Sequence, residues 1–444
     1  MNSRSYCDGV PRRSMLRVGT AGLCGATLTL SGLLQHSARA GRTPHVGDDV
    51  SLIIVFLRGG LSTVDTVDLK SQAPAEVRGE FSPIETCVPG TLVCEHLPKM
   101  ARQMDKFSLV RSFSHFDANH ATADHYVLTG YPVRPGFNSN LKPNNQHPAH
   151  GATIAHKRGP RGSVPPYVCL PRLHASAGSA FLGPGAAPFV VNADPNAPNF
   201  SVPDLIAPPV IDTHRVQLRT DLREQIDRYR QSAEIRANRP ARALATFQEK
   251  AFDLMTSSAA KAAFEIDREP QALRDEYGRT SLGQCCLMAR RLVEAGVRCV
   301  TIDHTNWDTH YAAFPVLKNE LLPQLDGAVP ALFRDLSDRG LLDTTLVLVT
   351  GEFGRTPRIN NRAGRDHWSS VSTLIVGGGG IQGGRVIGAS DALAEKPATD
   401  PVTPEDLAVT LFHRLGIDPK DEFYGPDGRP HQIANGGRII AGLW

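Results

Sequence analysis

Continuous apolar runs along the chain predict the buried strands of a sheet. These runs are rich in β-branched residues and are bounded by turn-forming or polar residues. They lie at 51–57, 297–303, 345–350 and 371–376. Segments 283–295 and 316–339 have helical periodicity, and each stops at a glycine. The alternation of strand and helix over residues 280–380 therefore predicts an α/β fold with a parallel sheet and covering helices.

The middle of the chain has a different pattern. Residues 159–209 are dense in proline and glycine, which predicts short strands within loops. Residues 213–264 are rich in Arg, Gln, Glu and Ala with few helix breakers, which predicts two or three amphipathic helices. We therefore expect a single domain over 41–444, with an insertion at 159–264.

The first forty residues have the pattern of an export signal. Arg12 and Arg13 precede a weakly apolar run at 18–34, and small residues around Ala40 resemble a cleavage site. Paired arginines resemble a twin-arginine signal and predict a periplasmic or extracellular protein. An ordinary secretory signal and an uncleaved anchor are the alternatives. The run is short and glycine-rich, so we expect no stable membrane span once the signal is removed.

Charge and cysteine content narrow the classes of partner. Residues 1–40 hold five arginines and one aspartate, so the rest of the chain is close to neutral and no nucleic-acid partner is expected. Cys87 and Cys94 flank a turn-like sequence. They could form a hairpin disulfide in an oxidising compartment or remain two free thiols.

Polar side chains gather where the predicted strands end. Arg58 follows the first strand, and the loops 115–125, 303–310 and 351–368 are rich in His, Asp, Glu and Arg. In an open α/β sheet, ligands bind outside the carboxyl ends of the strands. The loops therefore predict one polar site whose target is an anion, a metal ion or both.

Two spacings suggest specific chemistry within these loops. Asp308 and His310 are two residues apart, so both can turn toward one zinc, iron or manganese ion. The alternative is a hydrogen-bonded pair that only holds the loop. His120 and Asp124 are four apart and share a helix face, where the carboxylate would make the imidazole more basic. The other interpretation is that His120 and Asp124 are ordinary polar residues at the start of a helix.

Five motifs together resemble a known family. They read LRGGLSTVDTVDLK, HATADHYVLTG, NWDTH, GEFGRTPRIN and GRDHW. This combination resembles the exported, sulfatase-like domain-of-unknown-function family numbered 1501, which is grouped with the alkaline phosphatase/sulfatase superfamily. The resemblance covers roughly residues 50–440. It implies an alkaline-phosphatase-like α/β sandwich, with a mostly parallel sheet and helices on both faces.

The resemblance also implies site residues, with departures from the superfamily pattern. Arg58 stands where a metal-binding Asp is usual, His120 where the nucleophile is usual, and Glu352-Phe353 where Asp-His is usual. The implied ligands of one divalent ion (zinc, manganese, iron or calcium) are Asp308 (or Asn306), His310 and His367, and Asp366 is a further candidate ligand. The implied catalytic group is His120, Asp124, Glu352, Arg58 and Arg355.

Two functions follow from this pattern. The first is an exported hydrolase of a sulfate or phosphate ester on an anionic small molecule or glycan. In it His120 is the nucleophile or base, and Arg58 and Arg355 bind the anion. The second is a non-catalytic binding or scaffold protein that keeps the fold, which the missing superfamily ligands favour.

Overall fold

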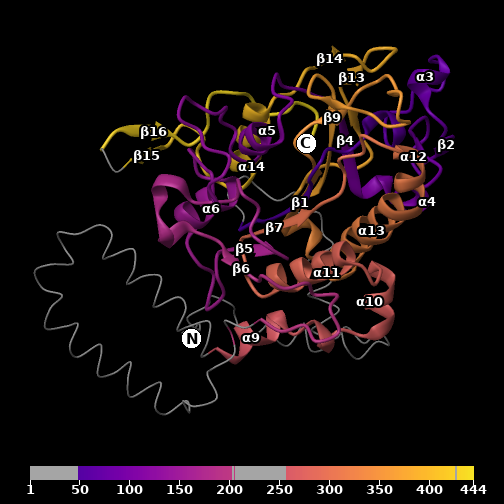
Figure 1. The fold of residues 1–444 in the computed structure, drawn as a ribbon. Helices are drawn as coiled ribbons and strands as arrows, with labels where there is room; N and C mark the ends of the chain where they lie inside the picture. Colours follow the sequence, from indigo (N-terminus) through magenta and orange to yellow (C-terminus); the bar gives the residue numbers. More distant parts are fainter. Residues whose placement is uncertain (1–48, 203–204, 206–256, 426–427) are drawn as a thin grey trace, which may run out of the picture. The chain divides into compact units, whose positions relative to one another are not determined.

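The computed structural model describes residues 49–202, 205, 257–425 and 428–444. All of them belong to one compact unit, Val46–Trp444, whose elements Figure 1 labels. The predicted signal at 1–40 and most of the predicted helices at 213–264 lie outside the described residues.

One eight-stranded sheet forms the centre of this unit. In spatial order its strands are β12 (Val386–Ile387), β4 (Phe107–Phe113), β11 (Ser372–Gly378), β8 (Thr345–Thr350), β1 (Ser51–Leu57), β7 (Cys299–His304), β5 (Tyr167–Leu170) and β6 (Phe189–Val190). Strand β1 pairs in parallel with both β7 and β8, so that Ile54 lies between Thr301 and Leu348. Strands β5 and β6 continue the parallel ladder beyond β7. The predicted mostly parallel sheet is confirmed.

Helices cover both faces of the sheet, because alternate side chains of β1 enter two separate cores. Ile53, Val55 and Leu57 belong to one core, and the side chains between them to the other. The first core includes α4 (Pro98–Arg102), α9 (Ser258–Phe264), α10 (Gln271–Tyr277), α11 (Ser281–Glu294) and α13 (Leu322–Asp338). The second includes α5 (His120–Thr129), α6 (His150–Arg158) and α14 (Pro404–Arg414).

Strand β11 runs against its neighbours, and this reversal shapes the site. It pairs antiparallel with both β8 and β4. The chain leaves β8, forms the hairpin of β9 (Gly354–Arg355) and β10 (His367–Trp368), and then enters β11. The start of β11 therefore lies at the same edge as the end of β8. Residues that follow one strand and residues that precede the other can meet there.

The structure adds detail to two expectations, the cysteine pair and the segment 159–264. Cys87 and Cys94 are free thiols. Cys94 pairs across the hairpin of β2 (Pro83–Glu85) and β3 (Leu92–Cys94) with Pro83, while Cys87 lies in the turn. The hairpin forms without a disulfide. In the segment 159–264, where an insertion was expected, β5 and β6 are part of the central sheet.

Shorter elements complete the unit. The predicted helix at 316–339 consists of α12 (Ala313–Val316), a π-helical turn at Leu317–Leu321, and α13. Besides short 3-10 turns, the remaining α-helix and strands of the described residues are α3 (Ala75–Arg78), β13 (Ala389–Ser390), β14 (Pro397–Thr399), β15 (Glu422–Tyr424) and β16 (Pro430–Gln432). Among the described residues, no helix combines the length and apolar character needed to span a bilayer.

Candidate metal centre

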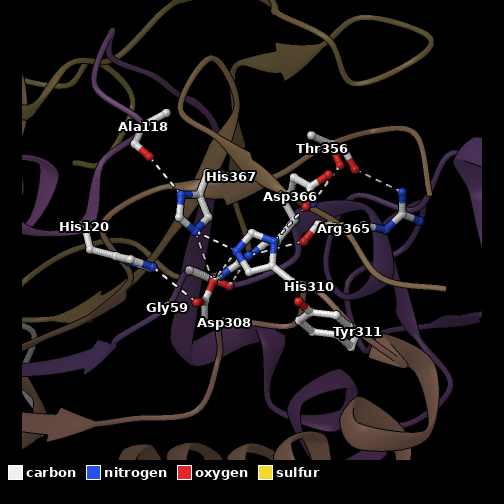
Figure 2. A network of polar contacts seen from close by, with 12 residues as sticks. Gly59, Ala118, His120, Asp308, His310, Tyr311, Thr356, Arg365, Asp366 and His367 are labelled. Atoms are coloured by element: carbon white, nitrogen blue, oxygen red, sulfur yellow. Dashed lines mark hydrogen bonds and ion pairs between the residues drawn. The ribbon is translucent and has the colours of Figure 1, made fainter. Parts of the chain in front are cut away.

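Three histidines surround Asp308 at the edge of the sheet where β1, β7 and β8 end. His120 opens α5, Asp308 and His310 lie in the loop after β7, and His367 lies in β10. Figure 2 shows the three imidazoles directed toward the Asp308 carboxylate. All four side chains are partly exposed, so a ligand can reach them from solvent.

The ring nitrogens of His310 and His367 face each other and the same carboxylate oxygen. Their Nε2 atoms lie 2.9 Å apart. Each Nε2 lies 3.1 Å from Asp308 Oδ1. His120 Nε2 lies 3.3 Å from the other oxygen, Oδ2. Ligand atoms of His120, Asp308 and His367 all lie within 4.8 Å of one another, which is close enough to hold one ion.

The second nitrogen of each ring is occupied by an acceptor. Nδ1 of His310 lies 2.7 Å from an oxygen of Asp366, and Nδ1 of His367 lies 2.8 Å from the carbonyl oxygen of Ala118. An Nδ1–H that donates to such an acceptor leaves the Nε2 of a neutral ring with a free lone pair. Lone pairs of both rings therefore converge beside Asp308, and this is the usual outer support of metal-binding histidines.

His120 is supported in the same way by a buried carboxylate. Its Nδ1 lies 2.6 Å from Glu352 Oε1, and Glu352 is fully buried. The backbone N–H of Gly59 donates to both oxygens of Glu352, at 2.8 and 3.0 Å. Hydrogen bonds to Asp308 and then to Glu352 raise the pKa of His120 to about 9 in the metal-free protein. Burial, followed by the charge of Asp124, raises the pKa of Glu352.

Asp308 is held as an anion by the groups around it. Burial opposes its ionisation, but the hydrogen bond from His120 and the charge of Arg355 lower the pKa of Asp308. Arg355 is itself buried, and its Nη2 lies 2.5 Å from Asp308 Oδ1. Arg355 therefore positions the carboxylate of Asp308 from the buried side of the cluster. Its guanidinium faces Asp308, where the sequence led us to expect an anion-binding group.

Two glycines allow the loops to approach closely enough to form the cluster. Gly59 has a φ of +115°, and a Cβ there would lie 2.3 Å from the backbone nitrogen of Asp308. A Cβ at Gly364 would lie 2.1 Å from the carbonyl oxygen of His310. Any larger residue at either position would move a ligand loop.

Phe353 is fully buried beneath the cluster, and its ring centroid lies 5.2 Å from that of His120 and 4.5 Å from that of His367.

Arg58 and Asp124 belong to a neighbouring polar cluster. The Nε of Arg58 lies 3.3 Å from buried Asp303, and Asp124 lies 3.4 Å from Nε2 of buried His174. Ser176 donates its backbone N–H to Nδ1 of His174, so Nε2 of the neutral ring carries the proton and faces Asp124. Arg58 and Asp124 therefore flank the three-histidine cluster, and Asp124 affects it through Glu352.

The donor set fits a divalent transition metal. Imidazole nitrogens and one carboxylate, each ring backed by an acceptor, suit zinc and also iron or manganese. Asp366, expected as a ligand, instead binds the outer nitrogen of His310. The carbonyl of Ala118 could not be found from sequence, because a backbone acceptor leaves no residue signature. Phe353 was noted only as a missing ligand, and its role as the floor of the site appears only in the fold.

Comparison with known proteins places the chain in a family. The sequence profile of the family described as "Protein of unknown function (DUF1501)" matches residues 49–444, so the chain belongs to this family. A comparison with curated proteins found no match.

Several solved structures are similar to this one at low sequence identity. A protein of the alkaline phosphatase superfamily from Vibrio parahaemolyticus is 11% identical, with 84% of this chain and 68% of that chain covered and a TM-score of 0.41. The PsFucS1 sulfatase from Pseudoalteromonas sp. is 12% identical, with 92% and 72% covered and a TM-score of 0.37. The phosphonate monoester hydrolase SpPMH from Silicibacter pomeroyi is 12% identical, with 88% and 76% covered and a TM-score of 0.35.

Proposed function

We propose that this member of the family is an exported hydrolase that cleaves a sulfate or phosphate ester with the help of one divalent metal ion. A single observation carries the proposal: the Nε2 atoms of His310 and His367 converge on Asp308 while both Nδ1 atoms lie against acceptors. Imidazoles that only stabilised a fold would gain nothing from facing each other in this way. His120 adds a third Nε2 to the same place.

A metal bound there would supply Lewis acidity, polarising an ester oxygen and lowering the pKa of water. Neighbouring side chains of the protein hold these groups in position. Arg355 fixes the Asp308 carboxylate, and Glu352 fixes the ring of His120. Arg58, whose side chain is 35% exposed at the end of β1, remains available to contact an ester anion from the side of the neighbouring cluster.

His120 has two chemically distinct roles open to it, and the geometry favours one. Its Nε2 could attack the ester, as expected from the superfamily position, or bind the metal. The closeness of this atom to ligand atoms of Asp308 and His367 supports metal binding. Its raised pKa also works against attack in the metal-free protein, because a protonated imidazole is not a nucleophile.

The test is to purify the protein, measure bound metal by elemental analysis, and assay aryl sulfates and phosphate mono- and diesters. We expect about one metal ion per chain and turnover that is lost in His367→Ala. His413→Ala, on α14, is the matched control and should leave both unchanged. Activity that survives in both His120→Ala and His367→Ala would refute the proposal.

The same variants distinguish the two roles of His120, metal ligand and nucleophile. If it binds metal, His120→Ala loses metal together with turnover. If it attacks the ester, His120→Ala keeps its metal, and rapid quenching of the unmodified protein with a phosphate ester traps an acid-labile phosphohistidine. The second outcome would restore the nucleophile expected from the sequence.

A non-catalytic binding role is the second candidate, and one observation favours it. Both guanidiniums expected to clamp the anion already face carboxylates, Arg355 on Asp308 and Arg58 on Asp303. This candidate predicts ligand-induced stabilisation without turnover. A turnover rate that depends on His367 would exclude it.

A further inference from the structure

An exposed aromatic ring and an exposed guanidinium lie at the rim of the metal centre. Tyr311 directly follows His310 and is 60% exposed, and Figure 2 shows it beside the cluster. The guanidinium carbon of Arg362 lies 4.0 Å from the centroid of the Tyr311 ring. Nη1 of Arg362 also donates a hydrogen bond of 2.7 Å to the Tyr311 hydroxyl. The two side chains form one unit, which we call the rim pair.

The backbone holds the rim pair in fixed register. Ala312 donates to the carbonyl of Arg362 at 3.0 Å, and Ala313 donates to the carbonyl of Ala363 at 2.8 Å. The side-chain oxygen of Asn360 accepts the backbone N–H of Arg362 at 2.9 Å. The amide nitrogen of Asn360 donates to the carbonyl of His310 at 3.1 Å and to Asp366 at 3.2 Å. One residue thus connects the rim pair to the metal centre.

This arrangement has a conformational cost. Ala312 and Ala363, which follow the two members of the rim pair, have φ values of 43° and 54°. Alanine is strained in this left-handed region, and such strain is concentrated at functional sites. Both rim side chains stay exposed, whereas Ala313 and Gly364, which follow the two alanines, are buried.

We propose that the rim pair is a substrate subsite that binds a sugar ring carrying its own anionic group, next to the ester held at the metal centre. The inference rests on the proposed function, and it names the substrate class as an anionic saccharide. An aromatic ring offers an apolar face with a polar edge, and this suits the mixed surface of a sugar. A guanidinium binds sulfate, phosphate or carboxylate through two parallel hydrogen bonds. A neutral aryl group would need the ring but not the cation.

The experiment measures binding by calorimetry on the zinc-loaded full chain, with disaccharides from heparin, chondroitin sulfate and κ-carrageenan and their desulfated forms. We expect at least one sulfated disaccharide to bind more tightly than its desulfated form. Tyr311→Ala should weaken that binding about tenfold or more, and Arg362→Gln should remove most of the preference for sulfate. Tyr311→Phe, which keeps the ring, should retain most of the affinity.

Controls and opposing outcomes keep this inference separate from the proposed function. Tyr424→Ala, of similar exposure on the distant hairpin of β15 and β16, and Arg268→Gln should bind as the unmodified protein does. If no sulfated disaccharide binds better than its desulfated form, or if the rim variants bind as tightly as the controls, the subsite is refuted. A hydrolase that turns over aryl sulfates would still stand in that case. Conversely, rim-dependent binding without turnover would keep the subsite and refute the hydrolase.

Discussion

Two polar clusters in this molecule differ in how their charges are arranged. In the first, Arg290 of α11 is almost fully buried, and its nitrogens lie 2.7–2.8 Å from Glu269, Glu294 and Asp335. Arg339 also reaches Asp335 at 2.7 Å. Cations and anions alternate there, and the charges raise the pKa of Arg290 despite its burial. This Arg290 network joins α11 to α13 and the loop before α10.

The candidate metal centre has the opposite arrangement. Lone pairs of two imidazoles face each other and a carboxylate, and the third ring approaches the same carboxylate. The Arg290 network pairs each of its acids with a cation, whereas the candidate metal centre collects acceptors that a cation would satisfy. Buried charge alone therefore does not identify a site. The informative feature is a set of acceptors directed at one point. We expect the Arg290 network to control stability and the metal centre to control binding.

The largest expected effect is on the Arg290 network. Arg290→Met leaves Glu269 and Asp335 buried without their central cation, which should lower the free energy of unfolding by about 3–5 kcal/mol. Urea denaturation of the purified protein measures the change. Metal content per folded chain should not change. If the variant loses its metal but keeps its stability, the division between the two clusters is wrong.

Removal of the metal should have the next largest effect. A metal present at a hundred times its dissociation constant stabilises the folded state by about 2.7 kcal/mol, because only the folded state assembles the ligands. Chelator should therefore lower the Tm of the unmodified protein. The Tm of His367→Ala should not respond to chelator. An equal response in the two proteins would place the metal elsewhere.

A smaller effect is expected from Glu352→Gln. Glutamine keeps the size of the side chain and an acceptor for Gly59, but it removes the charge that orients His120. Loss of such an outer partner weakens metal binding by about 10–100-fold. Competition with a zinc indicator measures the affinity. Glu294→Gln, which changes an acid of the Arg290 network, is the control and should bind zinc normally.

The smallest effect is a pH dependence of the metal-free protein. The pKa of His120 is raised from 6.5 to about 9 in the folded state. The stability from its ion pairs is therefore fully present below about pH 6.5 and is lost as the pH rises toward about 9. Because His120 is partly exposed, screening limits the loss to about 1 kcal/mol. Unfolding of chelated protein at pH 6 and pH 9 tests this. This pH-dependent loss of stability should be absent in His120→Ala. If the variant shows the same loss, another group causes it.

The fold was predictable where local pattern dominates. The apolar run at 345–350 coincides with β8, and the helix predicted at 283–295 is α11, which is followed by Gly296 at a φ of +108°. Burial on both sheet faces and a positive-φ glycine after a helix leave clear signatures in a sequence. The parallel order around β1 followed from strand–helix alternation. The reversal of β11 was not predictable, because strand direction depends on pairing partners distant in sequence.

The site shows the same division between local and tertiary information. The sequence by itself identified Asp308, His310, His367, His120 and Glu352 as residues of one polar edge, because their loops follow or precede strands. Only the tertiary structure decided their roles. In the fold, Asp366 contacts Nδ1 of His310, and Glu352 contacts Nδ1 of His120. Arg355 donates a hydrogen bond to the carboxylate of Asp308. The physical reason is that residue type fixes what an atom can donate or accept. Whether acceptors from different loops converge on one point depends on how closely those loops approach each other in the fold, as they do at Gly59.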